Sequence, residues 1–280
     1  MPSGYSQIVP NSSKLNYGFE TEPESNTAGR KLFWPRGRGW GGSSSINAMI
    51  YTRGHSSDYD HWRQLGNPGW SYDDVLPYFK RAENYEGDGD EEYHGKNGPL
   101  NVKKSTRDDD ILLDKFIEAG SQAGFPLTND FNGKQQEGFS RYEHTIKGSK
   151  RFSSARAYLH PALKRKNLYT KINITVDKVI FKNKKAIGIE YINKGKRVFC
   201  RGNKEIILSS GAVNSPQILM RSGIGDSEEI KKHGIEIVHE LKGVGKNLQD
   251  HIAVVSQFQC TQPVTLHRSA NFLGTMLAGV

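Results

Sequence analysis

The stretch from Trp34 to Asp60 constrains the fold most, because residues 41–47 at its centre read GGSSSIN. Two adjacent glycines let the main chain approach a flat or charged group closely, since neither has a Cβ. Three hydroxyls and an amide follow at once and offer hydrogen-bond donors and acceptors. The apolar residues among and after them argue against a flexible linker. The stretch therefore predicts a loop that lies against a ligand and leads into a buried segment.

The same stretch formally matches a dinucleotide fingerprint, with the pattern Gly37-x-Gly39-x-x-Gly42. That motif requires a strand before it, a helix after it and a second strand that ends at an acidic residue. Pro35 lies just upstream, where a central strand cannot accommodate it. Residues 53–57 are polar and interrupted by glycine, so no second strand precedes Asp58. We therefore prefer a ligand-contacting loop to a complete fingerprint.

Composition limits the classes of partner. The chain has 280 residues, enough for one large domain or two smaller ones, and a net charge of +9. Its lysines are scattered, without a basic stripe interleaved with aromatic residues, which argues against nucleic-acid binding. The basic surface instead favours weak contact with anionic partners or with a membrane surface. No run approaches the ~20 apolar residues of a transmembrane helix.

Cysteine and histidine usage gives no sign of a metal site. Cys200 and Cys260 form neither a disulfide framework nor a metal-ligand spacing, which favours a reducing, cytoplasmic compartment. The histidines also lack a metal-ligand pattern. Apart from His251, we expect them to be surface or loop residues.

The first half of the chain predicts helices separated by polar loops. Residues 1–33 and 87–108 are expected to be irregular, and residues 58–86 to form two helical pieces. Ser71-x-x-Asp74 is typical of a capping box, and Pro77 should shorten or kink the helix that follows. A further helix is expected over 110–123, ended by Gly124, and a short one over 154–163.

From residue 168 the pattern alternates as strands do, and short loops such as 193–195 predict an antiparallel meander up to residue 200. Residues 205–212 form a short apolar run that ends in small residues, which favours a buried parallel strand. A helix should then open at Ser215, with Pro216 near its first position, and close at Gly223. A strand that runs into Gly211 and Ala212 and then a helix is typical of nucleotide sites in α/β sheets, and equally of an ordinary strand–helix connection.

Three motifs together resemble the glucose–methanol–choline (GMC) flavoprotein oxidoreductases. They are residues 37–47 with Tyr51, Gly54 and Asp60 at the family spacing, residues 211–225, and residues 243–251. Residues 58–79 are similar to the choline and alcohol dehydrogenase branch. The resemblance covers nearly the whole chain. It implies a mixed α/β (α+β) fold that contains part of a Rossmann-like FAD-binding domain with a β-meander, and part of a substrate-binding domain.

The resemblance also implies how the chain is divided. Residues 1–57 and 151–255 correspond to the FAD-binding domain, whereas 58–150 and 256–280 correspond to the substrate-binding region. The family's GxGxxG turn would precede Met1, and its catalytic histidine, paired with His or Asn, would follow Val280. We therefore expect a central fragment of a longer protein that carries no catalytic base and is inactive alone. His251 lies beside Asp250 and could act as a base only with substrate in reach, but the resemblance implies a structural role or a place near the flavin.

The resemblance implies which residues contact the cofactor. In the family, the loop that matches residues 41–50 lies along the flavin and its pyrophosphate, Val176 matches a valine whose main chain meets the adenine, and two small residues lie near the ADP moiety. The cofactor-binding candidates are Gly41, Gly42, Ser43, Asn47, Ala48, Met49, Ile50, Val176, Gly211 and Ala212. An ordinary strand position explains the side chain of Val176 equally well. Because Ile46 stands where some relatives carry a flavin-linked histidine, we expect non-covalent FAD.

The implied reaction is the oxidation of a small primary or secondary alcohol. A base removes the hydroxyl proton, and the carbon transfers a hydride to flavin N5. The sequence leaves the electron acceptor open among oxygen, a quinone and another carrier. Two alternatives remain: a family member that keeps flavin structurally and has lyase-like activity, and a non-enzymatic basic binding module.

Overall fold

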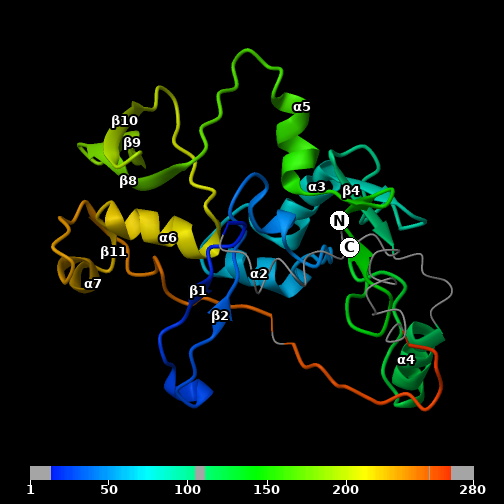
Figure 1. Ribbon diagram of the computed structural model, residues 1–280. Helices are drawn as coiled ribbons and strands as arrows, with labels where there is room; N and C mark the ends of the chain where they lie inside the picture. Colours follow the sequence, from blue (N-terminus) through cyan, green and yellow to red (C-terminus); the bar gives the residue numbers. More distant parts are fainter. Residues whose placement is uncertain (1–13, 105–110, 252, 266–280) are drawn as a thin grey trace. The chain divides into compact units, whose positions relative to one another are not determined.

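The computed structural model describes residues 14–104, 111–251 and 253–265, which fall into two compact units (Figure 1). Unit 1 comprises Met1–Tyr169 with Gln259–Val280, and unit 2 comprises Thr170–Phe258. Among the helices of these described ranges, none is long and apolar enough to cross a membrane.

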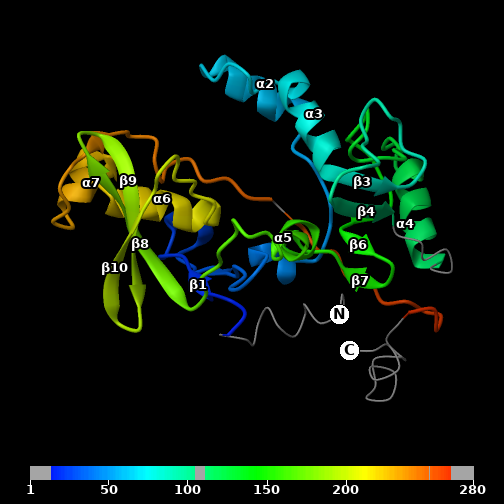
Figure 2. The same cartoon turned by 90° about the horizontal axis from the view of Figure 1, so that it is seen from above.

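A small mixed sheet forms the centre of unit 1. Its strands are β3 (Glu83–Glu86), β4 (Leu100–Lys104) and β5 (Glu143–His144), in the order β3-β4-β5. β3 and β4 are parallel, whereas β5 is antiparallel to β4. Figure 2 shows the hairpin of β6 (Ile146–Lys147) and β7 (Lys150–Arg151) next to β4. Val102 on β4 is fully buried, so the middle strand passes through the core.

Two helices precede the sheet, as the sequence predicts. α2 spans Ser56–Gln64 and α3 spans Tyr72–Ala82. The capping box predicted at Ser71 is confirmed, since its side chain accepts from the amide of Asp74 while the Asp74 carboxylate accepts from the amide of Ser71. The helix continues past Pro77 to Ala82, so the proline does not shorten it, and the kink expected as the alternative stays a prediction. The helical segment predicted to end at residue 86 ends at Ala82 instead, because residues 83–86 pair with β4 as strand β3.

The two remaining helices predicted for unit 1 are confirmed. α4 spans Ile111–Gln122, and the short helix expected over 154–163 forms as a π-helical turn, Ala155–Leu159, followed by α5, His160–Ala162. The strand β4 was not expected, because residues 87–108 read as a charged loop. Its two buried residues, Asn101 and Val102, are adjacent and do not give the alternation typical of a strand, so its place beside β3 comes from the tertiary fold.

Short elements surround the glycine-rich stretch. β1 (Phe19–Glu20) and β2 (Phe33–Trp34) form an antiparallel pair in a region predicted to be irregular, linked by a 3₁₀ turn over Ser25–Thr27. Gly42–Ser45 is also a 3₁₀ turn. A two-residue strand and a single turn are not the strand and α-helix of a dinucleotide fingerprint, which supports the interpretation of this segment as a loop.

Unit 2 contains the predicted antiparallel meander. β8 (Ile174–Lys182), β9 (Lys185–Asn193) and β10 (Lys196–Arg201) pair in the order β10-β9-β8. Both connections are two-residue turns with positive φ, 50° and 62° at Asn183 and Lys184, and 47° and 77° at Lys194 and Gly195. Such mirror-image turns match the twist of paired strands. β8 begins later than expected because Asn173, with φ of 57°, breaks the extended run before Ile174.

The segment after the meander differs from its prediction. Residues 205–209 pair with no strand of the part of the chain that the structure describes, so the expected buried parallel strand is wrong for this chain. An extended segment becomes a strand only when a neighbour bonds to it, and Ile207 is accordingly 78% exposed. α6 spans Gly211–Arg221, so the helix begins before Ser215 and Pro216 lies inside it.

α6 packs against β8, and a bond from the Val179 amide to Ser222 Oγ (2.8 Å) joins the two elements. After Gly223, β11 (Ile224–Gly225) pairs in parallel with β12 (His239–Glu240), and α7 (Ser227–Lys231) connects them. Ile230 on α7 is 1% exposed and Ile218 on α6 is 5% exposed. These side chains form the apolar centre of this part of unit 2.

Candidate functional site

The glycine loop, residues 41–50, has a backbone that favours glycine at its start. Gly41 and Gly42 have φ of 87° and 53°, in the left-handed region. A Cβ on Gly37 would lie 2.2 Å from the Gly42 oxygen, so the chain crosses itself closely at this point. A Cβ on Gly42 would meet no atom within 4 Å. The main chain at Gly42 therefore faces open space and can be approached directly by a flat group.

The second half of the loop enters the core of unit 1, as predicted. Ile46 and Met49 are 6% and 5% exposed. Met49 has a left-handed φ of 65°, which is unusual for a residue with a Cβ. The Asn47 Oδ1 atom accepts from the Met49 amide (3.1 Å), and the Met49 carbonyl accepts from the Thr145 amide (2.8 Å). These bonds hold Met49 in its conformation, and strain of this kind is typical of ligand-clamping segments.

A cavity of about 390 Å³ borders the loop at Gly41. Its other walls come from the segment after β7 and are mostly apolar: Ser154, Ala155, Tyr158, Leu159, Ala162 and Leu168. The open space over the Gly42 main chain, together with the apolar cavity beside the adjacent Gly41, suits a ligand with a flat ring and polar edges.

The structure distributes the predicted cofactor residues over both units. Gly41, Gly42, Ser43, Asn47, Ala48, Met49 and Ile50 lie together in the glycine loop of unit 1. In unit 2, Val176 lies on β8, and Gly211 and Ala212 are the first residues of α6, which packs against that strand. Gly211 has φ of 83° and open space at the position of a Cβ, so its main chain is accessible in the same way as that of Gly42.

A buried ionic cluster lies just beyond the glycine loop and consists of Arg53, Glu83, His94, Asp130 and Glu143. The Glu83 Oε2 atom accepts from Arg53 Nη2 (2.9 Å) and from His94 Nδ1 (3.0 Å). On the other side of the imidazole, His94 Nε2 lies 2.7 Å from Asp130 Oδ2. The side chains of Arg53, Glu83 and His94 are at most 2% exposed. Charges buried to this degree are stable only when paired, as they are here.

His94 is positively charged in this cluster. Burial lowers the pKa of His94, but hydrogen bonds to Asp130 and Glu83 and the charges of both carboxylates raise it to about 9. Burial alone would raise the pKa of Asp130, but the bond from His94 keeps it below its ordinary value. His94 lies in a loop, as expected of the histidines other than His251, but its burial and pairing were not predicted, because its partners come from distant positions that no local pattern marks.

Glu143 forms the other end of the cluster. Tyr85 donates its hydroxyl to Glu143 Oε1 (2.6 Å), and Asn132 Nδ2 donates to Oε2 (2.6 Å). Burial raises the pKa of Glu143 above its ordinary value. The ring of Tyr85 also stacks on His94, with centroids 3.9 Å apart. The hydrogen bonds from Tyr85 and Asn132 offset part of this effect of burial on Glu143.

The spacing of His94, Asp130 and Glu143 would allow a metal ion, since one ligand atom of each lies within 4.8 Å of the others. Both nitrogens of His94 are already hydrogen-bonded to carboxylates, and its charged form has no lone pair to offer a metal. The arrangement is that of a hydrogen-bonded ionic cluster.

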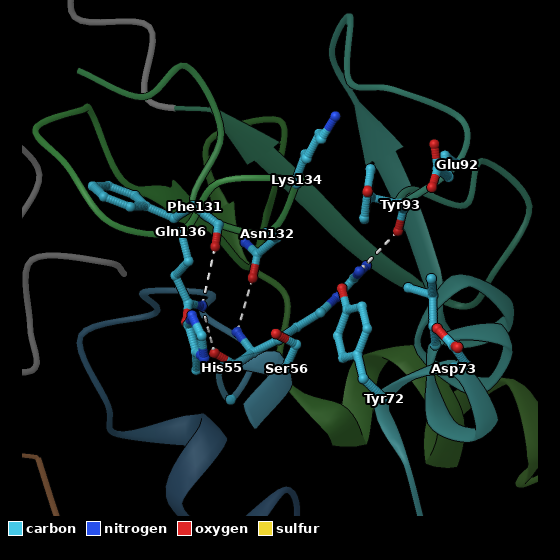
Figure 3. A pocket seen from close by; sticks show the side chains of 14 residues that line it. His55, Ser56, Tyr72, Asp73, Glu92, Tyr93, Phe131, Asn132, Lys134 and Gln136 are labelled. Carbon is cyan, nitrogen blue, oxygen red and sulfur yellow. Dashed lines mark hydrogen bonds between the residues drawn. The ribbon is translucent and has the colours of Figure 1, made fainter. Parts of the chain in front are cut away.

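The cluster fixes the main chain that follows the glycine loop. Figure 3 shows Asn132 and Gln136 bonded to the backbone of residue 53, and a guanidinium nitrogen bonded to the Tyr93 carbonyl. These bonds are 2.8–2.9 Å long. The pocket drawn in the figure has a volume of about 270 Å³ and is bordered by the same residues together with Tyr72. The bonds anchor the main chain and side chain of Arg53, three residues after the glycine loop, so the cluster acts as a support for the loop.

His251 lies on the surface of the described residues, and its amide donates to Asp250 Oδ1 (2.8 Å). The expectation that the histidine does not act as the base stays a prediction.

The chain matches one protein family, and its relatives include choline dehydrogenases. Residues 20–253 match the family described as "GMC oxidoreductase". Human mitochondrial choline dehydrogenase is 47% identical over 267 residues, which cover 95% of this chain and 45% of that protein. The oxygen-dependent choline dehydrogenase of Brucella anthropi is 47% identical over 280 residues, 100% of this chain and 50% of that protein. The chain thus spans about half the length of these relatives.

Two solved structures of oxidoreductases have a fold similar to that of this chain. Pyridoxine 4-oxidase from "Mesorbium loti" matches with a TM-score of 0.78 and 31% identity, over 85% of this chain and 47% of that one. An FAD-dependent oxidoreductase from Chaetomium thermophilum matches with a TM-score of 0.78 and 30% identity, over 84% and 43%. These matches confirm the predicted mixed α/β fold class.

Proposed function

Because the chain belongs to the GMC oxidoreductase family, we propose that the protein containing it is an FAD-dependent oxidoreductase that acts on the CH–OH group of a small alcohol. The relatives named above are dehydrogenases and oxidases, which favours redox turnover over a lyase-like activity with structural flavin. The observation that carries the proposal is the glycine loop, where the main chain at the left-handed Gly42 faces open space and the adjacent Gly41 borders an apolar cavity.

The residues present fit FAD. In the glycine loop, the main chain at Gly41, Gly42 and Ser43 and at residues 47–50 would hold the flavin and its pyrophosphate. In unit 2, Val176, Gly211 and Ala212 would hold the ADP moiety. When bound, FAD supplies a two-electron acceptor for the hydride of the alcohol carbon. The hydroxyls of Ser44 and Ser45 donate to the carbonyls of Gly41 and Trp40, so they would shape the loop, while other donors of the loop would orient the cofactor and stabilise developing negative charge.

FAD is expected to bind without a covalent link through this loop. Ile46 is an aliphatic residue that is 6% exposed, and it provides no nucleophile. The proton of the alcohol must be removed by a base.

A choline-like alcohol is the first substrate to test, because relatives named for choline oxidation match almost the whole chain. The full-length protein should be purified gently and its visible spectrum recorded. We expect flavin absorbance, and bleaching of that absorbance when choline is added without oxygen. FAD should be released by acid, as a non-covalent cofactor is. Reoxidation with oxygen and with a soluble quinone would identify the electron acceptor.

The outcomes separate the alternatives. A colourless protein that binds polyanions with a steep salt dependence would indicate the basic binding module instead. A yellow protein that no alcohol bleaches would indicate a structural flavin. Bleaching by other alcohols but not by choline would keep the reaction class and change the substrate.

We also propose a cytoplasmic protein that contacts membranes peripherally. Two free cysteines, one of them exposed, favour a reducing compartment, and the net charge of +9 favours anionic lipid surfaces. Cell fractionation with a high-salt wash tests both points, since electrostatic membrane contact is released by salt.

A further inference from the structure

Arg151, on β7, hydrogen-bonds to the glycine loop from a position 104 residues away from Asn47 in the sequence. Its Nη1 atom donates to the Asn47 carbonyl (2.7 Å), to Asn47 Oδ1 (2.9 Å) and to the Ser44 carbonyl (3.2 Å). One nitrogen with two hydrogens thus serves three acceptors, all on the loop. Arg151 is half-buried, and this desolvation lowers the pKa of its guanidinium.

Ser154 holds the start of the same loop. Its amide donates to Ser44 Oγ (3.0 Å), and its hydroxyl donates to the Gly41 carbonyl (3.2 Å). Ser44 Oγ also donates to the Gly41 carbonyl (2.5 Å). The carbonyls of Gly41, Ser44 and Asn47 are therefore turned toward residues 151–154. Arg151 and Ser154 together form what we call the loop anchor.

The loop anchor controls the strained part of the loop through Asn47. The same Oδ1 atom that accepts from Arg151 also accepts from the Met49 amide, where φ is 65°. Without the guanidinium, the Asn47 side chain loses a fixed partner, so the acceptor of the Met49 amide is held less firmly. A non-glycine residue keeps such a conformation only when its surroundings hold it.

We propose that Arg151 is a positioning residue for FAD, assisted by Ser154, which holds the glycine loop in the conformation that binds the cofactor. This inference rests on the proposed function, since it assumes that the loop binds FAD. Arg151 acts through the loop, because its bonds are made to loop carbonyls and to the Asn47 amide group. Removing a charged donor from three acceptors should therefore weaken FAD binding while the sheet of unit 1 persists.

The test uses the full-length protein with Arg151 replaced by Ala and by Lys. Lys150→Ala is the matched control, because Lys150 is the neighbouring residue of β7 and is exposed. FAD is removed from each protein, and its dissociation constant is then measured from the quenching of flavin fluorescence. We expect Arg151→Ala to weaken FAD binding about tenfold or more, Arg151→Lys to weaken it less, and Lys150→Ala to leave it within about twofold.

Added guanidinium ion distinguishes positioning from general destabilisation. It should restore much of the FAD affinity of Arg151→Ala and have no such effect on the control. If the apo form of Arg151→Ala melts early, Arg151→Lys and Ser154→Ala decide, since both keep more of the original contacts. An Arg151→Ala protein that binds FAD as tightly as the wild type would overturn the inference and leave the proposed function intact. A wild-type protein that binds no FAD would overturn both.

Discussion

The stability of unit 1 should depend on the protonation of His94. The imidazolium donates from Nδ1 to Glu83 and from Nε2 to Asp130, at 3.0 and 2.7 Å. A neutral imidazole carries one N–H, so one carboxylate would face a lone pair. The pKa of His94 is about 9 in the folded protein, compared with 6.5 for an ordinary histidine. Each factor of ten in proton affinity corresponds to about 1.4 kcal/mol, so the protonated state contributes about 3 kcal/mol to the free energy of unfolding.

Folding raises the pKa of His94, so protonation of this residue stabilises the folded protein. This contribution is fully present below pH 6.5 and is lost as the pH rises through 9. The carboxylate of Asp130, whose pKa is held below its ordinary value, stays ionised over this range, and the guanidinium of Arg53, whose pKa is raised, stays charged. We therefore expect the charge of His94 to change between pH 6 and pH 10, and with it the strength of its two hydrogen bonds.

The assay is urea unfolding of the wild type and of His94→Gln, at steps from pH 6 to pH 10. At pH 6 the variant should be less stable, and the difference in unfolding free energy should shrink by about 3 kcal/mol by pH 10. His61→Gln is the control, because His61 is exposed on α2. A stability difference between wild type and His94→Gln that stays constant over the whole range would refute the reasoning.

Three further substitutions test the support of the loop and its neighbours. Tyr85→Phe removes the hydroxyl that donates to buried Glu143 (2.6 Å) and should cost about 1–3 kcal/mol in urea unfolding. Gly37→Ala places a Cβ 2.2 Å from the Gly42 oxygen, so it should cost about 1–3 kcal/mol and lower the FAD content of the full-length protein. Ser71→Ala removes the N-cap of α3 and should cost about 1 kcal/mol in thermal or urea unfolding.

Each of these has a matched control. Tyr78→Phe alters a tyrosine that is 61% exposed, and Gly243→Ala adds a Cβ that meets no atom within 4 Å. Ser121→Ala alters an exposed serine inside α4. All three should change stability by less than about 0.5 kcal/mol. If a control destabilises as much as its partner, the specific contact is not the cause.

The features that were predicted correctly are local ones. The capping box of α3 is encoded within four residues, and both turns of the meander by short runs that tolerate positive φ. The glycine loop is equally local, because adjacent glycines followed by hydroxyls restrict the backbone and its neighbours whatever surrounds them. The family resemblance, which the comparisons confirm, depends on long motifs of this kind.

The incorrect strand predictions occur where pairing with residues distant in the sequence decides whether a segment forms a strand. β4 is a strand because β3 and β5 bond to it, although its own residues are mostly polar. Residues 205–209 have the apolar composition of a strand but no bonded neighbour among the described residues. Strand formation requires a partner, and the sequence of one segment does not contain that information.

The sequence by itself determined the glycine loop, the helix caps, the meander and the family, because each depends on residues close together in the chain. Only the tertiary structure brought Arg53, Glu83, His94 and Asp130 into one buried ionic cluster and placed Arg151 against Asn47. Isolated charges in polar segments resemble solvent-exposed residues until the fold excludes water from them. The loop was therefore recognisable from its own residues, whereas the side chains that hold it in place were not.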